Sequence, residues 1–250
     1  MYLLDHLVHF VEKPEHLVEK TRELGLHTAS GGKHDMWGTY NSLCYFGLTY
    51  IEFIGIFDKA LFDKSAQEPY TLHETYKNKN LQNGVVRIAL RTDTIEKDAE
   101  NLRSLGYSVY GPTEFSRTRP NGSILKWKLL HFGKENQNIE FPFIIQWNGN
   151  DENRYNDLVA SGTIKQHPLG PLQIKEIEIE VEHLATAAEW GSVFNFEVED
   201  NGTDYKMKMP NTFITFTPST GSNKISKIIL SGAKKEKEVF IEGTKYLFQK

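Results

Sequence analysis

Two short segments, Arg22-Glu23-Leu24-Gly25-Leu26 and Arg103-Ser104-Leu105-Gly106-Tyr107, decide the fold because they are copies of one another. Upstream of them, Leu4-Asp5-His6-Leu7-Val8 aligns with Val85-Val86-Arg87-Ile88-Ala89 at the same spacing. Downstream, Tyr50-Ile51-Glu52-Phe53-Ile54 aligns with Asn138-Ile139-Glu140-Phe141-Pro142 at a slightly larger spacing, which places the extra residues of the second copy in a loop at about 114–122. Ordered matches of this kind indicate a duplicated module.

The first copy is interpreted as a β-α-β-β-β unit, in which the helix and three of the four strands can be placed on the sequence. Residues 3–11 are rich in β-forming side chains, and Pro14 suits the first turn of a helix that Gly25 ends. A Gly-rich stretch follows, and residues 40–46 and 49–57 then predict two strands around a turn at Gly47.

The second copy repeats this order. It predicts a strand at 85–91, a helix at 95–105, and paired strands at 124–132 and 138–147. The interpretation is therefore an α+β protein with a double βαβββ domain at 1–150, built from modules at about 1–80 and 81–150.

The composition changes after the second copy. Residues 151–171 are expected to form a connector, since His167-Pro168-Leu169-Gly170-Pro171 fits neither a helix nor a central strand. Residues 173–182 alternate between aliphatic and glutamate side chains, which predicts a strand. A short helix at 184–193 and further strands follow, so we expect 172–250 to be a β-rich extension, a degenerate third unit.

Composition excludes several classes of protein. The 250 residues carry a net charge of −4, which offers no basic field for nucleic acid. The one cysteine, Cys44, excludes an internal disulfide framework. No apolar run approaches the length of a membrane span, and the start has no basic region typical of a signal peptide. We therefore expect a cytoplasmic protein with no nucleic-acid or membrane partner.

Two βαβββ copies resemble the vicinal oxygen chelate superfamily, which includes glyoxalase I, extradiol dioxygenases and bleomycin-resistance-type binders. The local motifs are most similar to the glyoxalase-like domain proteins, and the resemblance runs from Leu3 to about Gly170. It rests on Leu4-Asp5-His6-Leu7-Val8, Gly31-Gly32-Lys33-His34, Gly38-Thr39-Tyr40-Asn41, Tyr50-Ile51-Glu52-Phe53, Ser116-Arg117-Thr118-Arg119-Pro120-Asn121-Gly122, Leu125-Lys126-Trp127, Pro142-Phe143-Ile144-Ile145-Gln146-Trp147 and His167-Pro168. The resemblance implies that the two modules pair into a cup-shaped mixed sheet.

By the same resemblance, a metal would sit in the cup on four slots, which here hold His6, Glu52, Arg87 and Glu140. Arg87 has no lone pair to offer a metal, so glyoxalase I activity itself is not expected. A different set, His6, His34 and Glu52, matches the two-histidine, one-carboxylate pattern of iron or manganese sites, and zinc also accepts these donors. These three residues are the predicted catalytic set, which would act as metal ligands or, without a metal, as a histidine–carboxylate base pair. The simpler alternative is that His6 hydrogen-bonds Glu52 and that His34 is a polar loop residue.

A second group of residues is predicted to bind ligand: Asn41, Arg87, Arg119 and Glu140. Arginine binds carboxylate or phosphate in a bidentate manner, so Arg87 with Arg117 or Arg119 would hold an anion. The alternative is a structural pair between Arg87 and Glu140. Asn41 shares strand parity with Leu43 and Tyr45, and it either faces the cup or caps a loop.

The predicted function is the binding of a small anionic or carbonyl-bearing molecule in the cup. Whether the molecule is also transformed stays open at this stage. An enzyme would be a metal-dependent lyase, isomerase or dioxygenase, and a metal-free sequestering protein of the resistance type is the alternative. We also expect a homodimer, because the edges of a β-rich half-module need cover, and an interaction protein that uses those edges or the glutamate face is a third class.

Overall fold

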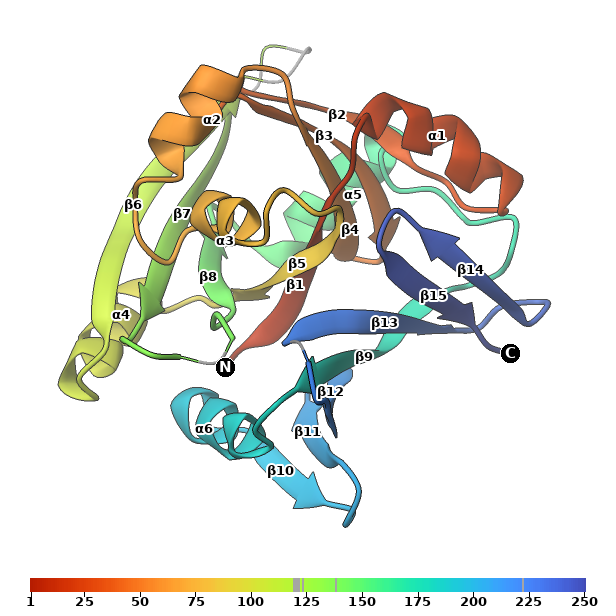
Figure 1. The fold of residues 1–250 in the computed structure, drawn as a ribbon. Helices are drawn as coiled ribbons and strands as arrows, with labels where there is room; N and C mark the ends of the chain where they lie inside the picture. The colour runs from red at the N-terminus through yellow and green to blue at the C-terminus, as the bar shows by residue number, and fades with distance from the viewer. Residues whose placement is uncertain (119–121, 123, 138, 222) are drawn as a thin grey trace.

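The computed structural model describes residues 1–118, 122, 124–137, 139–221 and 223–250. Within them the chain forms six helices and fifteen strands in two curled mixed sheets. The first sheet has the strand order β2-β3-β4-β1-β5-β8-β7-β6 and is drawn from red to green in Figure 1. Its strands are β1 (Leu3–Phe10), β2 (Ala29–His34), β3 (Thr39–Phe46), β4 (Thr49–Ile56), β5 (Gly84–Arg91), β6 (Ser108–Thr118), β7 (Ile124–Gly133) and β8 (Phe143–Trp147).

The predicted duplication is confirmed. The helices α1 (Pro14–Glu23) and α4 (Ile95–Ser104) each follow the first strand of a βαβββ module. β1 and β5 pair in antiparallel fashion at the centre, with His6 opposite Ala89 and Val8 opposite Arg87. A local two-fold axis between Leu7 and Ile88 therefore exchanges His6 with Arg87, as the aligned sequences predict.

The register corrects the second half of the alignment. β4 runs parallel to β1 and places Glu52 opposite Val8, while β8 runs parallel to β5 and places Phe143 opposite Ala89, the counterpart of Val8. The second-module counterpart of Glu52 is therefore Phe143, not Glu140. Glu140 precedes β8, and Pro142, which has no N–H to donate to the ladder, stands just before the first residue of that strand. The predicted strand start, residue 138, lies outside the described residues.

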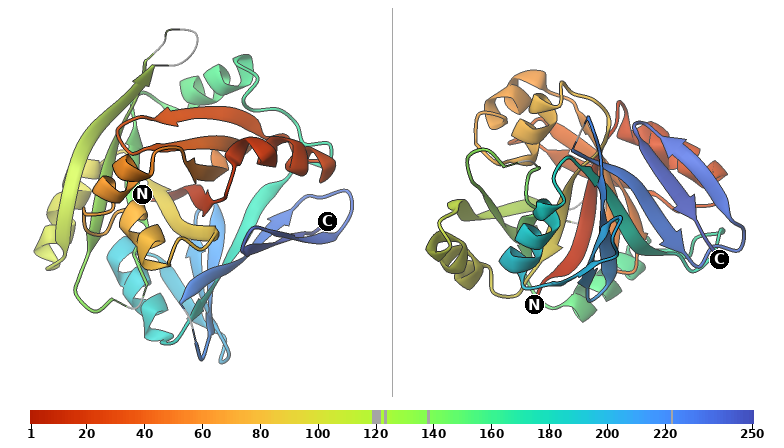
Figure 2. Two further views of the ribbon diagram at one scale, coloured as in Figure 1. Left: turned by 45° about the horizontal axis from the view of Figure 1, so that its top comes forward. Right: turned by 60° about the horizontal axis from the view of Figure 1, so that its bottom comes forward.

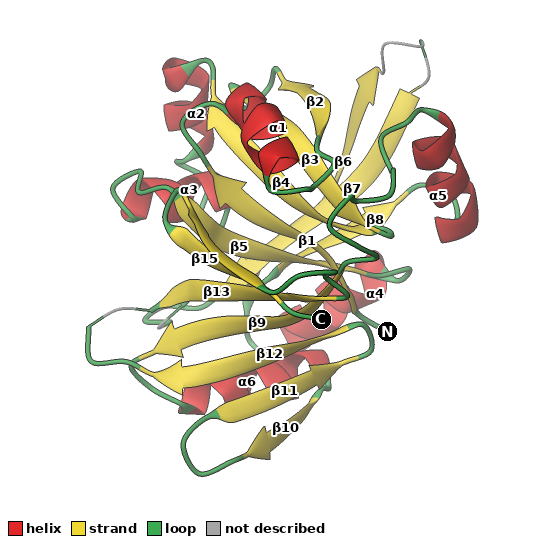
Figure 3. Ribbon diagram, turned by 90° about the vertical axis from the view of Figure 1, so that its right-hand side faces the viewer, coloured by secondary structure: helices red, strands yellow, loops and turns green. Residues whose placement is uncertain are grey.

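The C-terminal extension is more regular than a degenerate unit. β9 (Gln173–Val181), α6 (Ala185–Phe194), β10 (Glu197–Asp200), β11 (Tyr205–Met209) and β12 (Thr212–Pro218) form a complete third βαβββ module. β13 (Lys224–Ser231), β14 (Lys237–Ile241) and β15 (Thr244–Phe248) form part of a fourth. The second sheet, β10-β11-β12-β9-β13-β15-β14, thus repeats the order of the first without a described counterpart of β6 (Figure 3).

The two sheets pack against each other through the faces that carry their helices. One core cluster joins Leu7 of β1 and Leu17 of α1 to Ile177 of β9 and Trp190 of α6. His9 Nδ1 lies 2.6 Å from the hydroxyl of Tyr246 across this junction. Figure 2 shows the blue C-terminal strands crossing the red and yellow central strands on that side. The concave face of the first sheet, which we call the cup, is left free for a site.

The segment between the first two modules covers part of the cup. It contains α2 (Lys59–Ser65) and α3 (Leu72–Asn78), drawn in orange in Figure 1. Phe62 of α2 and Tyr76 of α3 pack in one cluster with Phe10 of β1 and Val86 of β5. In the connector, the expected short helix is α5 (Asp151–Ala160). No helix among the described residues is long and apolar enough to cross a membrane.

Candidate functional site

A cavity lies in the cup between the strands of the first and the second module. Its walls are mostly apolar and aromatic, as is usual for small-molecule sites. The space open to the centre of a water molecule is about 80 Å³, and the whole atom-free space, mouth included, is about 660 Å³. The residues that decide its chemistry are His6, His34, Asn41, Glu52 and Arg117, and the others include Trp37, Leu43, Tyr45, Tyr50, Leu72, His73, Trp127, Leu129, Phe143 and Trp147.

His6 enters the cavity because β1 bulges next to it. The pairing of β1 with β5 shifts register between Leu4 and His6, so Leu4 packs in the core between the sheets while His6 lines the cup. A regular strand would put two residues that are two apart on the same face. The His6 ring stacks on Tyr50 at 4.5 Å and is 4% exposed.

Asp5 orients the His6 ring. Its Oδ1 lies 2.7 Å from His6 Nδ1, and its Oδ2 accepts a hydrogen bond of 3.0 Å from Trp147 Nε1. The guanidinium groups of Arg91 and Arg154 lie 4.0 and 3.5 Å from the same oxygen. Burial alone would raise the pKa of Asp5, but the hydrogen bond from His6 and the charges of His6, Arg154 and Arg91 outweigh it and lower that pKa. Asp5 is thus a carboxylate at neutral pH and accepts a hydrogen bond from the Nδ1–H of His6, which leaves Nε2 for the cavity.

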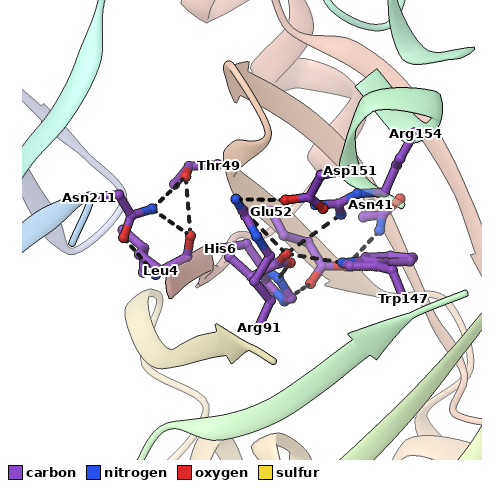
Figure 4. A network of polar contacts seen from close by, with 11 residues as sticks. Leu4, His6, Asn41, Thr49, Glu52, Arg91, Trp147, Asp151, Arg154 and Asn211 are labelled. Carbon is purple, nitrogen blue, oxygen red and sulfur yellow. Dashed lines mark hydrogen bonds and ion pairs between the residues drawn. The ribbon is translucent and has the colours of Figure 1, made fainter. Parts of the chain in front are cut away.

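Glu52 is held on the opposite side of His6. Its Oε2 lies 3.7 Å from His6 Nε2, and its Oε1 accepts a 2.6 Å hydrogen bond from Asn41 Nδ2 (Figure 4). Asn41 Oδ1 accepts in turn from the Gly32 amide at 2.9 Å. A Cβ on Gly31 would lie 1.9 Å from Asn41 Oδ1, so glycine is required for this approach. The Gly-rich stretch that follows the first helix, for which the sequence predicted no strand, thus contains the bulged strand β2 with Gly31 and Gly32.

His34 and Arg117 lie at the mouth of the cavity. His34 Nδ1 is 3.0 Å from Thr39 Oγ1, and burial followed by the Arg117 charge lowers the pKa of His34 against the opposing effect of Glu52. Arg117 belongs to β6 and not to the predicted loop. In the described part of the chain its guanidinium has no hydrogen-bond or ion-pair partner, and Arg117 lines the cavity.

The predicted metal ligands share the cavity without forming a metal site. Across the residues that the structure describes, no three His, Cys, Asp or Glu side chains converge closely enough to hold a metal ion. Phe143, in the second-module position of Glu52, adds no donor. The positions of His6, His34 and Glu52 in this structure therefore do not fit the predicted metal centre.

Of the predicted ligand-binding residues that the structure describes, one lines the cavity and two lie outside it. Asn41 lines the cavity, whereas Arg87 lies beneath α3 and outside its lining. The Arg87 guanidinium donates to Thr75 Oγ1 at 2.8 Å and to the carbonyls of Tyr70 and Phe141 at 3.0 and 2.7 Å. It approaches Glu140 only as a longer-range charge, and Glu140 also lies outside the cavity lining. Arg119 lies outside the described residues.

Three contributors escaped the sequence reasoning. Asp5 is one, and its signal in the sequence is a carboxylate inside an apolar strand, because a buried charge needs partners. Arg154 of α5 reaches back from the connector, with its guanidinium 4.9 Å from the Trp147 ring. His73 comes from the cover of the cup, where no periodic pattern marks it.

A comparison with known families assigns the chain. A model of the glyoxalase-like domain matches residues 4–216, which covers both modules of the first sheet and reaches the end of the third module. The chain belongs to the glyoxalase-like domain family. This match extends beyond the part of the chain in which the sequence motifs are recognisable by eye. No curated protein matches this glyoxalase-like protein closely enough to count as a relative.

Solved structures agree with the assignment at the level of fold. A hypothetical protein from Staphylococcus aureus has a TM-score of 0.88 at 22% identity, and the match covers 99% of each chain. A fusion of a xylose isomerase-like TIM barrel with a 4-hydroxyphenylpyruvate dioxygenase has a TM-score of 0.51 at 13% identity, over 91% of this chain and 36% of that one. A methylmalonyl-CoA epimerase from Mycobacterium tuberculosis is 16% identical, covers 58% of this chain and 85% of its own, and has a TM-score of 0.39.

Proposed function

We propose that this glyoxalase-like protein binds a small anionic, carbonyl-bearing molecule in the cup and exchanges a proton with it. The observation that carries the proposal is the array of Asp5, His6 and Glu52 in a largely apolar cavity, where His6 Nε2 lies 3.7 Å from Glu52 and Nδ1 lies 2.7 Å from Asp5. A buried carboxylate that fixes the tautomer of a histidine is a recurrent arrangement for a general base.

The chemistry assigned to each group follows from its charge. His6 Nε2 takes a proton from the carbon next to the carbonyl, and the electron pair of the broken C–H bond moves onto the carbonyl oxygen. The resulting imidazolium lies between two carboxylates, which stabilise it because all three side chains are buried. Arg117 binds the anionic group of the ligand at the mouth. Return of a proton to the same carbon regenerates the ligand, so the step is a proton exchange that needs no other reactant.

Ligand titration by calorimetry tests the binding half of the proposal. The probes are pyruvate, 2-oxobutyrate and methyl pyruvate, the last of which lacks the negative charge. We expect the two acids to bind and the ester to bind more weakly. E52Q is expected to bind the acids as well as the wild type or better, since it removes a negative charge from the cavity. If neither acid binds, or the ester binds as tightly as pyruvate, the proposed ligand class is wrong.

A sequestering protein of the resistance type is the second candidate, because Glu52 is already hydrogen-bonded to Asn41 and aromatic rings form much of the wall. Binding of the acids without proton exchange supports this candidate against the first.

We also propose that the protein forms a homodimer. β14 is an edge strand of the second sheet, and its Phe240 side chain is 69% exposed. Exposed edges of this kind invite pairing with a second chain. Light scattering at high concentration should give the mass of a dimer, and a monomer there contradicts this proposal.

A further inference from the structure

A second hollow adjoins the first beneath α3. Trp37, Leu72, His73 and Leu129 line both cavities, so the two are neighbours along the cup. The second hollow lies over the second-module strands β6 and β7 and is closed on one side by α3 and the residues before it. Its atom-free space is about 870 Å³, of which about 310 Å³ admits the centre of a water molecule.

His73 projects from α3 into this part of the cup with an unused polar atom. The residue is 4% exposed, and its Nε2 is buried with no hydrogen-bond partner among the residues described. The nearest ring contacts are Trp37 and Phe62, both with centroids at 5.5 Å, and those aromatic faces do not satisfy an imidazole nitrogen. An unsatisfied buried polar atom is costly, so native proteins rarely retain one without a use.

His131 meets the same hollow from the floor. It follows Trp127 and Leu129 on the concave face of β7, and its ring lies 5.4 Å from Phe143. Its Nδ1 is also buried without a partner within the described chain. Two imidazoles from different elements therefore face one hollow, and among the residues described neither buried nitrogen has a hydrogen-bond partner.

Both rings are neutral. Burial lowers the pKa of His73 and that of His131 to about 3, and the Arg87 charge adds to the effect on His131. A neutral imidazole keeps one N–H donor and one acceptor. The N–H donors of His73 and His131, together with the nearby charge of Arg87, favour a ligand oxygen that accepts hydrogen bonds.

We propose that the cup is a two-chamber site, in which His73 and His131 bind an acceptor oxygen at the far end of an elongated ligand. This inference rests on the proposed function, since it puts the near end of the same ligand at His6 and Glu52. The substrate class is then a 2-oxo acid with a second oxygen-bearing group, separated from the first by an apolar chain that lies along Trp37, Leu72 and Leu129.

The test compares 2-oxo diacids with 2-oxo monoacids of equal chain length by calorimetry. The diacids are 2-oxoglutarate, 2-oxoadipate and 2-oxopimelate. In the wild type, the diacid of one of these chain lengths should bind about tenfold more tightly than the monoacid of the same length. A gain of this size is expected from one additional hydrogen bond to a charged carboxylate. H131F should remove this gain and leave the affinity for the monoacid unchanged, and H73F should also remove the gain. H131Q keeps an N–H donor and should retain part of the gain. This variant also tests the proposal if H131F does not fold.

The control is H16F, a change of an exposed histidine on α1, which should keep the full gain. If the monoacids bind but no diacid gains over its monoacid, the second chamber is refuted and the proposed function stands. A gain that survives in H131F and H73F also refutes it. If no acid binds at all, both proposals fail together.

Discussion

Asp5 and His6 are adjacent in the sequence, yet they act as a hydrogen-bonded pair, with Oδ1 and Nδ1 2.7 Å apart. A regular strand would send these two side chains to opposite faces of the sheet. The bulge between Leu4 and His6 makes the pair possible by re-aiming β1 at this point. Every role assigned to His6 depends on this local departure from strand geometry.

Replacement of Asp5 by Asn tests that dependence. D5N should lower the free energy of unfolding by about 3 kcal/mol, because Asp5 is fully buried and its loss leaves Arg91 and Arg154 with only the partly exposed Asp151 as a carboxylate partner. Urea denaturation measures the change. D93N alters an exposed carboxylate and should be neutral. Equal stability of the two variants would mean that Asp5 is not the organising charge.

Arg117 should control the binding of anions at the mouth. R117A is expected to weaken pyruvate binding by about tenfold to a hundredfold, since a charge-assisted hydrogen bond is worth roughly 1.5–3 kcal/mol. R22A is the matched control, because Arg22 is exposed and pairs with Glu19 on α1. A dissociation constant for R117A within twofold of that of R22A contradicts this role.

Gly31 should tolerate no side chain. In G31A the new Cβ would collide with Asn41 Oδ1, which moves the amide that holds Glu52. We expect a loss of about 1–3 kcal/mol in stability, typical of overpacking. G221A, at a site with no atom within 4 Å, should leave the melting temperature nearly unchanged. Similar melting temperatures for the two variants would show that β2 can move away from Asn41.

Much of the first sheet was predictable, because the duplicated segments carry the order of elements and the equivalence of His6 with Arg87. The predicted equivalence of Glu52 with Glu140 was wrong. Strand register is set by hydrogen bonds between neighbouring strands, and short sequence matches do not reveal it. Asn41 was placed on the correct face by parity, whereas Arg87 was expected in the cup but is covered by α3. The helical cover and the bulge at Asp5 arise from tertiary packing, which leaves no periodic signal in the sequence.

Stability should fall as the pH drops below about 6.5. Burial lowers the pKa of His9 to about 4, and that of His73 and His131 to about 3. As the pH falls, each of these imidazoles is protonated in the unfolded state before it is protonated in the folded state. Each therefore lowers the free energy of unfolding by about 1.4 kcal/mol per pH unit between its unfolded and folded pKa values. H9Q should reduce the proton uptake on unfolding by one, whereas H16Q at an exposed position should not. Unfolding measured from pH 7 to 5 gives this slope, and identical slopes for H9Q and the wild type would contradict the assignment.

The central claim is that His6, held by Asp5 and facing Glu52, exchanges a proton with a carbonyl-bearing ligand. The most direct measurement is deuterium incorporation at carbon 3 of pyruvate and 2-oxobutyrate in D₂O, followed by proton NMR. The wild type and R22A should accelerate exchange above the uncatalysed rate, and H6Q should lose at least a hundredfold of that acceleration, as expected for a general base. E52Q should lose part of it while still binding the acids. Exchange in H6Q at the wild-type rate, or no exchange in a wild type that binds the acids, would contradict the account.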